Sequence, residues 1–120
     1  NILELISASD LTVSLYSTVC YTAQIMLSQA YYPFTIPVYL FFNRDLKDYY
    51  KKTCFLDNIP LSDNKKSIII NSVQTIKESL LMSLDINFRL EVLRSIQKTF
   101  TLNKKDPAKE IVKILLESKK

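Results

Sequence analysis

The stretch LTVSLYSTVCYTAQIMLSQAYY, residues 11–32, carries the most weight in predicting the fold because none of its side chains is charged. A charge-free stretch of this length is long enough to cross a bilayer. Eight uncharged polar residues interrupt it, however, and Pro33 and Pro37 follow it, so we expect no membrane span and no membrane partner. With about 100° of rotation per residue, most apolar side chains fall on one arc and most polar ones on the other. This pattern predicts an amphipathic helix capped by Ser9 or Asp10.

Outward from this stretch, apolar residues recur every three or four positions, which is typical of helices with one buried side. Pro37 suits the first turn of a second helix, because its fixed φ matches helical backbone. The triplet Ile68-Ile69-Ile70 is also compatible with a strand, although nothing obvious is available to pair with it. The expected helices occupy residues 2–6, 10–32, 36–56, 62–82, 85–100 and 106–116.

These patterns predict an all-α chain of five or six helices packed as antiparallel hairpins. Two arrangements remain open, a helical-repeat-like stack and an irregular closed bundle. Residues 1–120 are enough for a single domain with one core. Because the chain begins with Asn1 rather than methionine, we expect it to be a piece of a longer protein.

The composition excludes most catalytic chemistry, because the 120 residues contain no glycine and no histidine. Phosphate-binding loops and nucleophile elbows depend on glycine. Histidine is the usual group for proton transfer near neutral pH and the commonest metal ligand. Cys20 and Cys54 lack the spacing of zinc or dithiol sites. We therefore expect no enzyme activity, no metal and no cofactor. We also expect the protein to be intracellular, in the nucleus or the cytoplasm.

Residues 62–101 suggest two amphipathic helices joined by a tight turn at residues 83–85. Asp85 is suited to cap the second helix, and Arg89, one turn later, can reach acidic or carbonyl groups of a neighbouring turn. This arrangement resembles a unit of the HEAT/armadillo-type helical repeats. The resemblance covers about a third of the chain and implies stacking against neighbouring repeats and a scaffolding role.

An uncharged helix surface and a cluster of aromatic residues favour a protein-docking function. Solvent-facing helix surfaces usually carry Lys and Glu, so the neutral surface of residues 14–29 suits a helix covered by neighbours or by a partner. The aromatic residues either fill the gap where two helices meet or form a docking patch. We predict a non-enzymatic protein–protein interaction or scaffold module that binds another protein or the rest of the parent chain. The interface candidates are Gln24, Gln29, Tyr31, Tyr32, Phe34 and Phe41.

The charge distribution supports an alternative function. The net charge is +4, and all 16 basic residues lie within residues 44–120. Such side chains either cover solvated helix surfaces or follow nucleic-acid phosphates, with an affinity that falls steeply as salt is added. The alternative is a basic helical domain whose C-terminal half binds nucleic acid non-specifically. Its candidate phosphate contacts are Arg94, Lys98, Lys105, Lys109 and Lys113.

Overall fold

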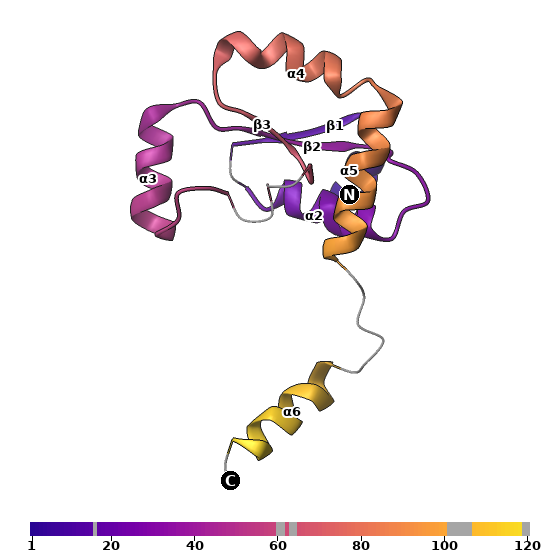
Figure 1. Cartoon of the computed structure of the whole chain (residues 1–120), viewed down its shortest axis with the longest axis vertical. Helices are drawn as coiled ribbons and strands as arrows, with labels where there is room; N and C mark the ends of the chain where they lie inside the picture. The colour runs from indigo at the N-terminus through magenta and orange to yellow at the C-terminus, as the bar shows by residue number, and fades with distance from the viewer. Residues whose placement is uncertain (16, 60–61, 63–64, 101–106, 119–120) are drawn as a thin grey trace.

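A parallel β-sheet forms the centre of the molecule, so the expected all-α class is wrong (Figure 1). The computed structural model describes residues 1–15, 17–59, 62, 65–100 and 107–118. The strands are β1 (Leu11–Ser14), β2 (Ile36–Leu40) and β3 (Ile68–Ile70), in the order β1-β2-β3. The fold is therefore a mixture of α and β. It is neither a HEAT/armadillo-type repeat, nor a repeat-like stack, nor a helical bundle.

The sheet supplies the partner that the triplet at 68–70 needs. Val38 of β2 is in register with Val13 of β1 on one side and with Ile68 of β3 on the other. Helices cover parallel sheets on their faces, so their strands tend to be short, continuous apolar runs rather than alternating ones. Such runs have no period that separates a strand from a buried helix, which is why the helical interpretation failed.

Pro37 lies inside the central strand and not in the first turn of a helix. A proline is rare there because it has no N–H to donate to the sheet. The Ile36 N–H points toward β1, where it donates to Asp10 O over 3.1 Å. Since successive residues of a strand alternate in direction, the Pro37 nitrogen points toward β3, just before the pairing with β3 begins at Val38. The missing donor therefore costs no rung of the paired ladder.

Helices precede, connect and follow the strands. They are α1 (Ile2–Ser7), α2 (Val19–Ser28), α3 (Arg44–Cys54), the short 3-10 helix η1 (Val73–Thr75), α4 (Ile76–Met82), α5 (Ile86–Thr99) and α6 (Pro107–Glu117). Asp10 precedes a strand, so it caps no helix. The prediction that Asp85 caps a helix is confirmed, because its Oδ1 accepts from the Asn87 N–H over 2.8 Å.

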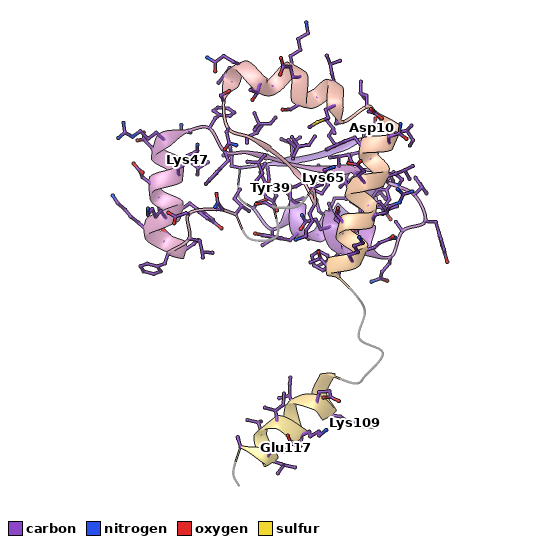
Figure 2. All side chains as sticks on the ribbon, in the orientation of Figure 1. Asp10, Tyr39, Lys47, Lys65, Lys109 and Glu117 are labelled. Carbon is purple, nitrogen blue, oxygen red and sulfur yellow. The ribbon has the colours of Figure 1, made fainter. Side chains whose placement is uncertain are left out.

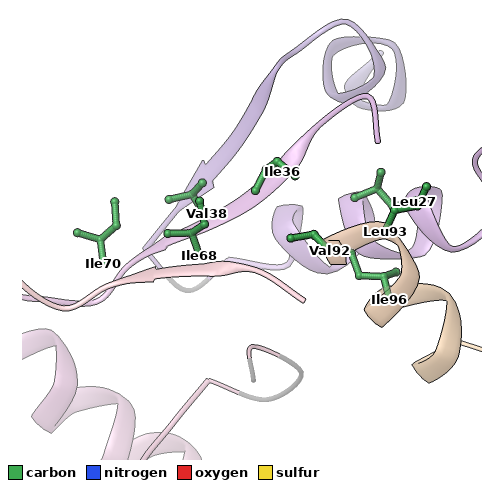
Figure 3. Close-up of a cluster of buried hydrophobic side chains, with 8 residues drawn as sticks. All are labelled: Leu27, Ile36, Val38, Ile68, Ile70, Val92, Leu93 and Ile96. Atoms are coloured by element: carbon green, nitrogen blue, oxygen red, sulfur yellow. The ribbon is translucent and has the colours of Figure 1, made fainter. Parts of the chain in front are cut away.

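The core lies where α2 and α5 meet the sheet. Helix α2 contacts β1 and β2 as well as α5, and α4 contacts β3. Figure 1 shows α2 and α4 on opposite sides of the sheet. Figure 3 shows the main cluster of buried apolar side chains, contributed by α2, β2, β3 and α5. Its members are Leu27, Ile36, Val38, Ile68, Ile70, Val92, Leu93 and Ile96.

Candidate protein-docking surface

A surface hollow at the end of α2 gathers four of the six interface candidates. It has a volume of about 510 Å³ and is lined mainly by the last turn of α2 and the segment that leads into β2. We call it the Tyr31 hollow. Its lining residues are Ser7, Ile25, Met26, Gln29, Ala30, Tyr31, Tyr32 and Phe34.

The prolines shape the segment that carries the aromatic residues. Helix α2 ends at Ser28, and a residue before a proline avoids helical backbone, so Tyr32 cannot continue the helix into Pro33. The chain then turns tightly, with the Phe34 N–H donating to Tyr32 O over 3.0 Å. This turn leaves the Tyr31 side chain fully exposed and that of Tyr32 mostly exposed.

Helix α5 holds this segment from behind at two carbonyl groups. Gln97 Nε2 donates to Ala30 O over 3.0 Å, and Arg89 Nη2 donates to Pro33 O over 2.8 Å. The two anchored carbonyls stand on either side of Tyr31 and Tyr32. The aromatic side chains are therefore exposed on backbone that is fixed at both ends.

Aromatic packing also fixes Tyr32. Its ring meets the Phe34 ring edge to face, with centroids 6.0 Å apart. Phe34 is half-buried and packs against the main core, so it connects Tyr32 to the interior of the protein. Edge-to-face pairs of this kind add about 0.5–1.5 kcal/mol beyond the burial of apolar area.

Gln24 and Phe41, the other two interface candidates, are buried and do not belong to the hollow. Gln24 Nε2 donates to Lys66 O over 3.2 Å, which ties α2 to the residues that lead into β3. The Phe41 ring packs edge to face on Tyr50, with centroids 5.8 Å apart. The uncharged surface of α2 is thus covered in part by this chain's own residues.

Sequence reasoning missed Ile25 and Met26 as lining residues. It placed Met26 on the same apolar arc as Cys20, Ala23 and Leu27, but those three residues are buried, whereas Met26 is only half-buried. The spacing of that arc, three and four residues, correctly identified the three buried residues. The start of the helix was wrong, because the expected helix begins at Asp10, whereas Asp10 precedes β1 and α2 begins at Val19.

The carboxyl edge of the sheet, where α/β proteins often bind ligands, contains a buried thiol. Cys20 Sγ donates to Thr12 O over 3.2 Å and lies 3.2 Å from Ser14 Oγ. Burial raises the pKa of the Cys20 thiol, and a protonated, buried thiol is a poor nucleophile. Within the described residues, no group of three or more His, Cys, Asp or Glu side chains could hold a metal ion. The absence of enzyme activity stays a prediction.

The candidate phosphate contacts are divided between two helices. Arg94 and Lys98 are exposed one turn apart on α5, and Lys109 and Lys113 are exposed one turn apart on α6 (Figure 2 labels Lys109). Lys105 lies outside the described residues. The structure therefore offers two separate pairs of basic side chains in place of one continuous ridge along a single helix.

None of the helices in the described ranges combines the length and the apolar character that crossing a membrane requires. Comparison of the chain with protein-family models, curated proteins and solved structures gave no match. The geometry of this chain is therefore the basis for any statement about its function.

Proposed function

We propose that the chain is a non-enzymatic protein–protein interaction module and that the Tyr31 hollow docks an apolar segment of its partner. The observation that carries this proposal is the exposure of Tyr31 and Tyr32 on backbone that α5 holds at Ala30 O and Pro33 O. Exposed aromatic side chains beside a hollow are typical binding hot spots. Because the backbone is already fixed, less conformational entropy is lost when a partner binds.

The chemistry of the hollow indicates what kind of partner it fits. None of its lining side chains is charged, and they combine apolar groups with the hydroxyl and amide groups of Ser7, Gln29 and the tyrosines. The matching surface would present apolar side chains with a few hydrogen-bonding groups. Contacts of this kind depend little on ionic strength. We therefore expect the dissociation constant to change less than about threefold between 50 and 200 mM salt.

The test begins with a photo-crosslinking amino acid at position 31, compared with the same group at position 55. Phe55 is 87% exposed at the end of α3 and belongs to neither the hollow nor its anchors, so it is a matched control. Mass spectrometry of the adducts identifies the partner. One dominant adduct that is specific to position 31 supports the proposal, and the same adducts at both positions contradict it.

Affinity measurements with the identified partner complete the test. Truncating both Tyr31 and Tyr32 to alanine should cost at least about 2 kcal/mol, which is about 30-fold in the dissociation constant. The control Phe55→Ala should leave the affinity unchanged. An unchanged affinity in the double variant would show that the partner binds elsewhere.

Phosphate binding is the competing function, and it has a different signature. Arg94, Lys98, Lys109 and Lys113 form no ion pair with another described residue. Four phosphate contacts would lower the affinity for duplex DNA by about 100-fold between 50 and 200 mM salt. Fluorescence anisotropy with a labelled duplex measures this dependence directly. Tight binding that follows it, and that Arg94→Ala weakens, would favour the competing function.

A further inference from the structure

Helix α6 presents an apolar surface that no other described element covers. Its eleven residues carry five large apolar side chains, each more than half exposed. A helix of this length is marginal in water unless packing stabilises its apolar side. The exposed apolar residues are Ile111, Val112, Ile114, Leu115 and Leu116.

A groove with matching character lies between α4 and β1. Its volume is about 550 Å³, and apolar side chains dominate its lining. Helix α4, which forms one wall, is only seven residues long, and Leu11 of β1 also lines the groove. We call it the α4–β1 groove. The apolar residues in its lining are Leu11, Val73, Ile76, Leu80, Leu81 and Leu84.

Charged residues give the groove a direction. Lys77 lies at the start of α4. Asp10 lies near the other end, because Arg89 Nη1 donates to both Asp10 O and Ser83 O, at 3.4 and 3.1 Å. Glu78, the remaining charged residue of α4, does not line the groove. The groove is thus basic near the start of α4, whereas charges of both signs, Asp10 and the Arg89 guanidinium, lie near the end of α4.

Helix α6 is more positive at its start than at its end. Lys109, Glu110 and Lys113 lie in its first two turns, so that part has one excess positive charge, and Glu117 is its last residue (Figure 2 labels Lys109 and Glu117). A helix laid antiparallel to α4 would place these lysines near Asp10 and the glutamate near Lys77. A parallel arrangement would place Lys109 and Lys113 near Lys77, where like charges repel. The antiparallel arrangement also opposes the two helix dipoles favourably.

The length of the chain between α5 and α6 argues for a second molecule as the partner. In the antiparallel arrangement α6 begins near the end of α4, which is also where α5 begins. Helix α5 has 14 residues and is about 21 Å long, whereas the chain from Phe100 to Pro107 spans at most about 25 Å. Docking within one molecule would need this connection almost fully extended along α5. Figure 1 shows α6 at the opposite end of the molecule from its own α4.

We propose that α6 of one molecule docks antiparallel to α4 in the α4–β1 groove of a second copy of this chain. In a two-fold symmetric dimer, α6 of each molecule docks in the groove of the other, so both apolar surfaces of α6 are covered and both grooves are filled. Such an assembly is closed at two molecules. Apolar side chains of α6 fill the groove, while Lys113 lies near Asp10 and Glu117 near Lys77. This interface is separate from the Tyr31 hollow and does not depend on its function.

Analytical ultracentrifugation of the full chain tests the proposal. The expected species at 100 µM, a concentration chosen for the experiment, has twice the 13.9 kDa mass of the chain. Leu81→Glu in the groove and Leu115→Glu on α6 should each raise the dissociation constant at least about tenfold. Both side chains are exposed, so neither change disturbs the core. Phe55→Glu, at an exposed apolar position outside both surfaces, is the control.

A charge exchange tests the orientation. Lys77→Glu and Glu117→Lys should each weaken the dimer in low salt, and the double variant should recover the original affinity. A dimer that Leu115→Glu leaves intact, or a double variant without recovery, would overturn the proposed arrangement. If the chain is monomeric, a second copy does not occupy the α4–β1 groove, and the proposal is wrong. Protection of the α6 amides from hydrogen exchange in that monomer would identify docking within one molecule, and their fast exchange would leave the groove to another partner.

Discussion

Replacing Arg89 by alanine should lower the free energy of unfolding by about 3 kcal/mol. Its guanidinium group connects three segments, because it donates to Pro33 O at 2.8 and 3.2 Å, to Ser83 O at 3.1 Å and to Asp10 O at 3.4 Å. The side chain is half-buried. Hydrogen bonds from a charged donor contribute about 1.5–3 kcal/mol each, but carbonyls near the surface regain water when the donor is removed. We therefore assign about 1 kcal/mol to each of the three carbonyls, which gives the predicted loss of about 3 kcal/mol in the free energy of unfolding.

Urea unfolding followed by far-ultraviolet circular dichroism measures this loss, with an unchanged m-value expected. For a domain of this size it corresponds to a fall of about 10 °C in Tm. Arg94→Ala, on the same helix at an exposed position, should change stability by less than about 0.5 kcal/mol. Arg89→Lys should recover only part of the loss, because an ammonium group cannot reproduce the planar fork. If Arg89→Ala is as stable as Arg94→Ala, the guanidinium does not connect these segments.

Three further predictions concern buried groups. Cys54 is exposed and should react quickly with a thiol reagent, whereas Cys20 is buried and should react only on unfolding, so two fast thiols would contradict the packing of α2 on the sheet. Tyr39→Phe should stabilise the fold by about 1 kcal/mol in urea titrations, because the buried phenol oxygen has no hydrogen-bond partner within the described residues. Burial raises the pKa values of Cys20 and Tyr39 above their ordinary 9.0 and 10.0, so the unfolded chain loses these protons first as the pH rises. Stability should therefore fall above about pH 9, by up to 1.4 kcal/mol per pH unit for each group, and a urea midpoint that rises there would refute the sign.

Helix ends were the part of the fold that local sequence could predict. Asp85 caps α5, and α6 begins at Pro107, because both features depend on backbone groups only a few residues away. The strands could not be found in the same way. β1 has four residues and β3 has three, and neither strand is stable until it pairs with β2.

The same distinction separates the interface candidates. The sequence left open whether Tyr31 and Tyr32 fill a gap between helices or form an exposed patch. Both are exposed, because Pro33 interrupts the helix next to them whatever the rest of the fold does. Gln24 is a residue type that is usually exposed, yet it is buried and bonded to Lys66 O, 42 residues away in sequence. Phe41 is buried by Tyr50 of α3, on an element whose position the sequence did not define. A partner distant in sequence leaves no local signal.

The parallel order of the strands has a consequence for how the chain folds as it is synthesised. Parallel neighbours cannot be joined by a hairpin, so β2 cannot pair with β3 until α3 and the residues that follow it have been synthesised. At about 5–20 residues per second, ribosomes need about 2–6 s to add the roughly 30 residues between these strands. Throughout that interval an uncharged, apolar segment has left the ribosome without its final neighbour. Protection by a chaperone during those seconds would matter more for this protein than for one whose strands pair as hairpins.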